Sequence, residues 1–268
     1  MNEGYKEILS RISSSSPTPG GGSVAALALA HAHSLALMVA RLTKGRKTSA
    51  DGVEAAEAVL ISSEPGVDRA IALAEKGYWV FRMGKVVRDA FSVDHPRILD
   101  YANSEYRSDF LDIWLLAKCY FCISSGTGLD EVARIFRRPA VYVNNIPLHQ
   151  LVTYDHVITV PKYLVWKEIN KQLTLSEHLA YPYFHTDQYD NEKILVVDLT
   201  PKDIKQAVLE IEARLKGSWE ESEEDRQLQD KFLEIFQSHP DFYKNHGEIH
   251  PEARVGTHFL RNNPEWLN

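Results

Sequence analysis

The sequence predicts an α/β fold, in which a Rossmann-like domain follows a short all-helical segment. Helical and strand-like patterns alternate from about residue 68 onward, which is typical of α/β units. The run Ala140-Val141-Tyr142-Val143 is continuously apolar, as expected for a strand buried on both faces of a parallel sheet. Before residue 65 the chain is instead rich in serine, glycine and alanine. We therefore predict two domains, 1–65 (helical) and 66–268 (α/β).

The first domain reads as three helices separated by loops. Residues 3–13 have the apolar spacing of an amphipathic helix. Ser23 follows three glycines and is a suitable N-cap for an alanine-rich helix over 24–43. A further helix is predicted from about 50 to 61, where the breaker-rich run 62–66 ends it. The small side chains of 24–43 favour close packing against another helix.

The second domain reads as alternating helices and strands. Gly77 is a suitable cap for the helix that precedes it, and Pro201 suits the first turn of a later helix. The predicted helices are 68–76, 108–119, 128–137, 201–215 and 219–236, and the predicted strands are 78–82, 120–124, 139–144, 157–160 and 194–197.

Composition excludes several classes of function. The net charge of −7 gives no support to nucleic-acid binding. The only candidate membrane span, 24–42, contains His31, His33 and Arg41, so we expect no integral membrane span. Two cysteines, Cys119 and Cys122, exclude a disulfide framework and fit a reducing, cytoplasmic compartment. The histidines and cysteines lack the spacing of metal ligands, so we expect no metal site.

The strongest candidate site follows the strand 120–124. The loop Ser124-Ser125-Gly126-Thr127-Gly128 combines hydroxyl donors, glycines and the start of a helix, which suit an anion such as phosphate. Asp130 and Glu131 are the nearest carboxylates. Arg82 and Lys85 follow another strand, and the carboxyl ends of parallel strands meet at one edge of the sheet. These two cations are therefore candidate diphosphate ligands.

Each of these features also has a purely structural interpretation. The loop 124–128 lacks the Gly-Lys-Ser/Thr of a Walker loop and the glycine spacing of a dinucleotide fingerprint, so a tight strand-to-helix turn is the alternative interpretation. Arg82 and Lys85 are equally read as surface cations. Asp130 and Glu131 are common residue types in the first turn of a helix.

Residues 13–60 resemble the start of the formiminotetrahydrofolate cyclodeaminase / methenyltetrahydrofolate cyclohydrolase family. The resemblance rests on Ser16-Pro17-Thr18-Pro19-Gly20-Gly21-Gly22-Ser23 with the following alanines, and on 38–47. It implies an all-helical dimer, with Pro19, Gly20, Gly21, Gly22 and Ser23 contributing to a pocket for a tetrahydrofolate derivative. The N-terminal helices are then a candidate homodimer contact. The later helices of that family are not recognisable after about residue 65, so the domain is incomplete.

Residues from about 69 to 268 resemble a bacterial glycosyltransferase-like family of surface-polysaccharide biosynthesis. The resemblance rests on 75–85, 101–112, 121–133 and 137–144, with 256–260 matching the closing motif. It implies the donor-binding half of a GT-B enzyme, with a nucleotide-sugar bound by Arg82, Lys85, Ser124–Gly128, Asp130 and Glu131. The substrate would be the nucleotide-sugar, no separate cofactor would be needed, and the partner would be a glycan acceptor.

Three functions follow as expectations. The first is a glycosyltransferase-related transferase that binds a nucleotide-sugar and, lacking the acceptor half, does not complete the reaction alone. The second is a folate-dependent cyclodeaminase or cyclohydrolase. The third is a non-catalytic fusion or remnant whose helical segment mediates dimerisation.

Overall fold

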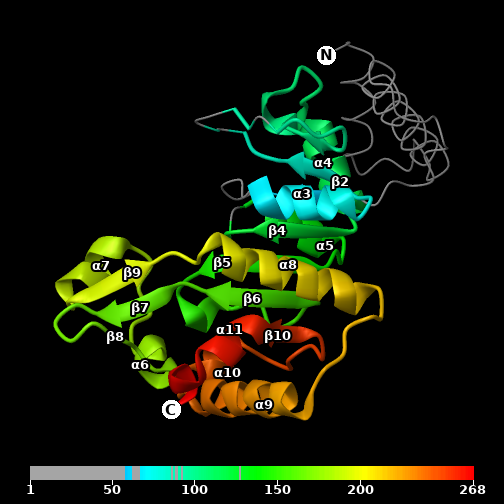
Figure 1. The fold of residues 1–268 in the computed structure, drawn as a ribbon. Coiled ribbons are helices and arrows are strands. Elements are labelled where there is room, and N and C mark those ends of the chain that lie inside the picture. The colour runs from blue at the N-terminus through cyan, green and yellow to red at the C-terminus, as the bar shows by residue number, and fades with distance from the viewer. Residues whose placement is uncertain (1–57, 62–66, 86, 88–89, 92, 127) are drawn as a thin grey trace, which may run out of the picture. The chain divides into compact units, whose positions relative to one another are not determined.

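The computed structural model describes residues 58–61, 67–85, 87, 90–91, 93–126 and 128–268 (Figure 1). The chain divides into two units, Met1–Ala56 and Glu57–Asn268, and the described residues all belong to the second. The helices predicted over 3–13 and 24–43, the loop Pro19–Ser23 and the proposed dimer contact lie outside the described residues.

The second unit is built on a parallel sheet of seven strands in the order β10-β6-β5-β4-β1-β2-β3. All neighbouring pairs are parallel, which confirms the α/β fold with a parallel sheet that the sequence predicts. The strands are β1 (Ala58–Ile61), β2 (Trp79–Arg82), β3 (Ile98–Leu99), β4 (Phe121–Ser124), β5 (Ala140–Asn145), β6 (Val157–Pro161) and β10 (Ala253–Val255).

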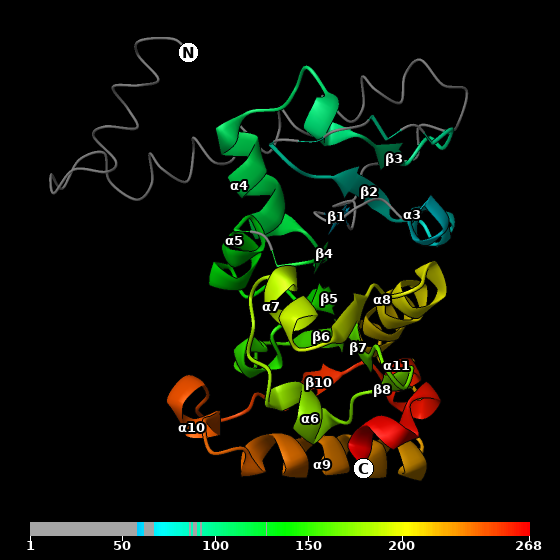
Figure 2. The same ribbon diagram turned by 90° about the vertical axis from the view of Figure 1, so that its left-hand side faces the viewer.

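Helices cover both faces of the sheet, as parallel strands require because their connections must cross over a face. Figure 2 shows α4 and α5 on one side of the strands and α3 and α8 on the other. The helices are α3 (Val67–Glu75), α4 (Asp109–Lys118), α5 (Asp130–Ile135), α8 (Pro201–Leu215), α9 (Glu223–Ser238) and α11 (Thr257–Asn262), with shorter α6 (Leu175–Leu179), α7 (Thr186–Asn191) and α10 (Phe242–Asn245). The strand order and the two helical layers are consistent with a Rossmann-like fold.

Helix starts follow the capping signals in the sequence. Ser108 caps α4, because its Oγ accepts the Leu111 N–H at 3.2 Å. Thr200 forms a reciprocal capping box with Asp203, and Pro201 occupies the first turn of α8. Ser222 and Asp225 form the same box at the start of α9. The helix predicted over 219–236 therefore exists, and it begins four residues later than expected, at Glu223.

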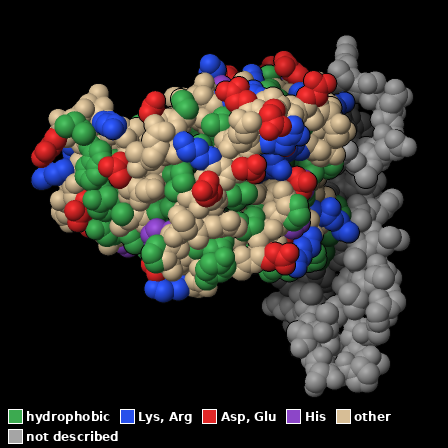
Figure 3. Space-filling view, turned by 90° about the horizontal axis from the view of Figure 1, so that it is seen from below, with side chains coloured by type: hydrophobic (Ala, Val, Ile, Leu, Met, Phe, Trp, Pro, Cys, Tyr) green, Lys and Arg blue, Asp and Glu red, His purple; other side chains and the backbone are tan. Residues whose placement is uncertain are grey.

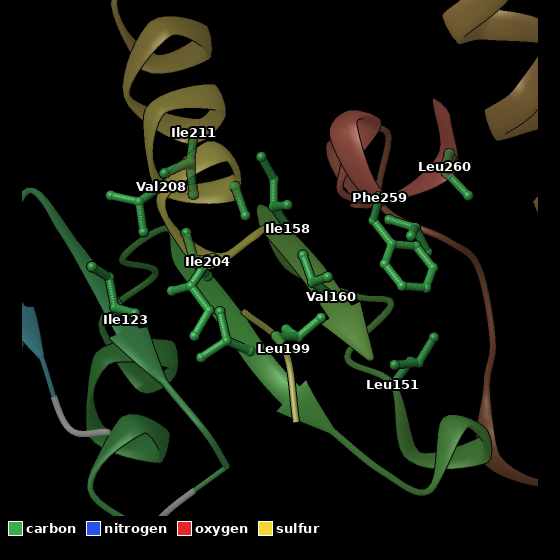
Figure 4. Packing of buried hydrophobic residues seen from close by; sticks show 14 of the residues in the cluster. Ile123, Leu151, Ile158, Val160, Leu199, Ile204, Val208, Ile211, Phe259 and Leu260 are labelled. Carbon is green, nitrogen blue, oxygen red and sulfur yellow. The ribbon is translucent and has the colours of Figure 1, made fainter. Parts of the chain in front are cut away.

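The core lies where the sheet meets α8 and the C-terminal helices. Figure 4 shows Ile158 and Val160 of β6 facing Ile204, Val208 and Ile211 of α8. Phe259 of α11 closes the same cluster on the other flank. Fully burying each such side chain stabilises the fold by about 1.5–3 kcal/mol.

A second, antiparallel sheet of three strands projects beside the first. It consists of β7 (Tyr163–Trp166), flanked by β8 (Lys171–Gln172) and β9 (Ile194–Val197). Leu164, Leu173, Tyr189 and Ile194 form its own small core. The strand predicted over 194–197 thus exists, but in this smaller sheet.

One predicted element is wrong. We expect helix from about 50 to 61, yet Ala58–Ile61 forms β1, which pairs with both β2 and β4. Val59, Leu60 and Ile61 form a short apolar run that suits a central strand as well as a helix, and pairing on both sides decides between them. The α/β unit therefore includes residues that the sequence assigns to the helical segment.

No helix among the described residues has the length and apolar character needed to cross a membrane.

Candidate functional site

The order of the strands locates the candidate site. From β1 the chain continues outward to β2 and β3 in one direction, and then returns to build β4, β5 and β6 in the other. Ligands of open α/β sheets bind outside the carboxyl ends of the strands at such a reversal. The ends of β2 and β4, at Arg82 and Ser124, flank the end of β1 there.

The segment after β4 is a tight turn. Ser124 is fully buried, and its Oγ accepts the Gly126 N–H at 3.1 Å. Gly126 has φ +84°, a left-handed conformation that side chains disfavour. Ser125 is exposed, and a Cβ added at Gly128 would meet nothing within 4 Å. Thr127 lies outside the described residues. The turn therefore leaves space beside its second glycine.

The two carboxylates after the turn differ in environment. Asp130 is buried at 2% exposure, and burial raises the pKa of its carboxyl although the nearby Tyr142 and Ser124 side chains act to lower it. Burial and the nearby Asp130 raise the pKa of Tyr142 in turn. Glu131 is exposed and pairs with Arg134 one turn along α5. Asp130 thus holds the turn from inside, while Glu131 faces solvent.

Arg82 forms an ion pair with Asp100, a residue that the sequence analysis does not include among the candidates. Its Nη1 donates to both oxygens of Asp100, at 3.1 and 3.2 Å, and the residue is only 6% exposed. Asp100 also accepts the Phe91 N–H at 2.8 Å. Lys85 is exposed near the end of β2. Asp100 directly follows β3, and the carboxyl ends of parallel strands meet at one edge of the sheet. Its position in the sequence could therefore have indicated that it lies near Arg82.

The structure places Arg82, Ser124, Gly126 and Asp130 at one edge of the sheet, in two separate groups. Ser124, Gly126 and Asp130 form one group around the start of α5, and Arg82 with Asp100 forms another across β1. Ligand contacts for Arg82, Lys85, Ser124, Ser125, Gly126, Thr127, Gly128, Asp130 and Glu131 stay a prediction. Within the described ranges, no three His, Cys, Asp or Glu side chains gather as metal ligands.

Comparison with known proteins gives one match to a family. The model of the formiminotransferase-cyclodeaminase family matches residues 4–83. No curated protein and no solved structure matches the chain.

This match corrects the first functional expectation. A glycosyltransferase-related protein that binds a nucleotide-sugar is contradicted, because the matched family is the folate-enzyme family of the second expectation. The resemblance of 69–268 to a glycosyltransferase family receives no support from the comparisons.

Proposed function

We propose that this chain binds a reduced folate, as a formimidoyltetrahydrofolate cyclodeaminase- or cyclohydrolase-like protein. The observation that carries the proposal is the family match over residues 4–83, which contains the complete run Pro17-Thr18-Pro19-Gly20-Gly21-Gly22-Ser23. The run is the part of the sequence that resembles this family most specifically.

The residue types in this run suit a folate. Glycine has no side chain, so a backbone of three glycines can approach a flat pterin ring closely. The sequence-predicted helix over 24–43 begins directly after Ser23, and a helix start favours negative charge. The glutamate tail of a folate supplies carboxylates of that charge. We therefore assign Pro19, Gly20, Gly21, Gly22 and Ser23 to folate contacts.

The proposal is restricted to binding by the early part of the match. Residues 58–61 and 67–83 contribute β1, α3 and β2 to a parallel sheet, whereas the family resemblance implies helices throughout. These residues therefore do not supply the helices that would complete an all-helical pocket. We propose reduced-folate binding as the activity of the chain, with dimerisation through the helices predicted before residue 58, and we expect no turnover by the chain alone.

Isothermal titration of the full chain with 5-formyltetrahydrofolate tests the proposal. Gly21→Asp adds a side chain and a negative charge to the loop, so we expect it to weaken binding at least tenfold, or about 1.4 kcal/mol. Gly247→Asp is the matched control, because a Cβ there meets nothing within 4 Å and the residue is exposed.

Two outcomes contradict the proposal. One is the absence of folate binding by the unmodified chain. The other is equal binding by the Gly21→Asp and Gly247→Asp variants, which would exclude the glycine loop from the contact.

A further inference from the structure

The edge of the sheet where the strands begin carries exposed apolar side chains next to cations. Because all seven strands are parallel, the segments that precede them meet at this edge, opposite the carboxyl ends. Ile135 and Phe136 end α5 there, with 74% and 48% of their surface exposed. Tyr154, before β6, is 53% exposed. Large apolar side chains gathered on a surface mark a site of interaction.

Cations surround these apolar side chains. Arg137 and Arg138 follow Phe136 directly, and the Arg138 Nε donates to the Ala117 carbonyl at 2.8 Å. That bond places Arg138 beside the end of α4, where Lys118 is exposed. We name this group the amino-edge patch, and it consists of Lys118, Ile135, Phe136, Arg137, Arg138 and Tyr154.

The patch has an excess of positive charge. The carboxylate that contacts it is Asp155, which accepts from Arg137 Nη1 at 2.8 Å and lies 3.8 Å from Arg134 Nε. Arg134 also lies over the Tyr154 ring, 4.8 Å from its centroid. Glu131, in the first turn of α5, pairs with Arg134 as well, so Arg134 and Arg137 meet two carboxylates. The positive excess of the patch therefore comes from Arg138 and Lys118.

A second row of cations continues the charge along the same edge. Lys76 and Lys216 both bind the buried Glu212, at 2.7 and 2.8 Å, so two cations share one carboxylate here. Arg97 donates to the Gly77 carbonyl beside them. Glu75 and Asp94 are exposed in the neighbouring segments and offset part of this charge. By contrast, acidic and basic side chains are intermixed on the face seen in Figure 3.

We propose that the amino-edge patch docks this protein on an anionic phospholipid membrane surface. Interfacial binding needs apolar side chains that enter the boundary of the acyl chains, together with cations that meet lipid phosphates. Ile135 and Phe136 supply the first, and Arg137, Arg138 and Lys118 supply the second. The chain as a whole carries a net charge of −7, so binding to an anionic surface needs a local group of cations such as this patch.

A bilayer fits the patch better than a nucleic acid does. Single-stranded nucleic acids bind to proteins through rings on which bases stack. Phe136 and Tyr154 offer rings, but Ile135, the most exposed apolar residue of the patch, has none and suits the boundary of the acyl chains instead. The inference is independent of folate binding, because it rests on residues of the second unit alone.

Co-sedimentation of the full chain with vesicles tests the proposal. We expect binding to vesicles with 30% phosphatidylserine in phosphatidylcholine, and several-fold weaker binding when NaCl rises from 0.1 to 0.5 M. Ile135→Asp should lower the bound fraction at least fivefold. Its matched control is Ile169→Asp, at an isoleucine that is 65% exposed in the turn between β7 and β8. A second pair of variants tests the contribution of charge. Lys118→Glu changes a lysine of the patch, and Lys171→Glu is its matched control outside the patch, since both lysines are exposed.

Four results would overturn the proposal. They are no binding to anionic vesicles, equal binding to pure phosphatidylcholine, and equal loss in the Ile135→Asp and Ile169→Asp variants. The fourth is binding of a single-stranded oligonucleotide in place of vesicles, which would assign the cations to a nucleic acid. All four positions are exposed, so we expect each variant to keep its fold. Circular dichroism of each variant checks this.

Discussion

At the scale of single residues, two buried charged groups at the carboxyl edge have neighbours within the protein. Arg82 contacts Asp100, and the buried Asp130 lies against Ser124 and Tyr142. The sequence predicts that these side chains meet at one edge, because it shows which strands they follow. It does not show their partners, since Asp100 is 18 residues from Arg82 and Tyr142 is separated from Asp130 by a helix. Only the pairing of the strands brings these groups together.

The Arg82–Asp100 pair yields a prediction about stability. Asp100→Ala removes the carboxylate that balances a nearly buried guanidinium, so we expect the free energy of unfolding to fall by about 3 kcal/mol. Urea unfolding measures the loss, and the double variant Asp100→Ala with Arg82→Met should recover part of it. The exposed Asp230→Ala is the control, with an expected change within about 0.5 kcal/mol. An unchanged Asp100→Ala protein would show that Arg82 is not held by this pair.

At the scale of elements, the long periodic helices can be predicted from the sequence, whereas the short apolar strand β1 is determined by its pairing in the sheet. Helices α8 and α9 begin at the capping residues that the sequence shows, Thr200 and Ser222. Strand β1 does not follow from the sequence, because four apolar residues after a helical pattern have no periodicity of their own. Its pairing partners β2 and β4 come later in the chain, so local sequence cannot specify it.

An ion pair joins α9 to α11 and makes their packing depend on pH. Arg261 donates from Nε and Nη2 to the two oxygens of Asp225, both at 2.6 Å, and this contact lowers the pKa of Asp225 from 3.8 to about 2. Because the folded pKa is the lower one, the stabilisation is present above pH 4 and is lost as pH falls toward 2.

Asp225→Asn tests this dependence. The difference in unfolding free energy between the unmodified chain and the variant should be largest above pH 4 and shrink as pH falls toward 2. Urea unfolding at several pH values in that range measures it. The exposed Asp230→Asn provides the comparison, with a small difference at every pH. A constant Asp225→Asn difference between pH 5 and pH 2 would exclude the ion pair as its source.

At the scale of the whole molecule, we propose a different role for each of the two units. The folate contacts are proposed for the loop Pro19–Ser23, and membrane docking for an edge of the α/β unit. The described core draws its residues from 70–267, so the α/β unit buries an apolar core of its own. The sequence indicates this division through its change in composition, and the structure adds β1 to the α/β unit.

We propose that the first unit gives the chain its affinity for a reduced folate. Titration of 5-formyltetrahydrofolate into the full chain and into a fragment of residues 57–268 tests this role, with circular dichroism to confirm that the fragment is folded. We expect saturable binding by the full chain and none by the folded fragment. Equal binding by both, or binding by neither, would contradict it.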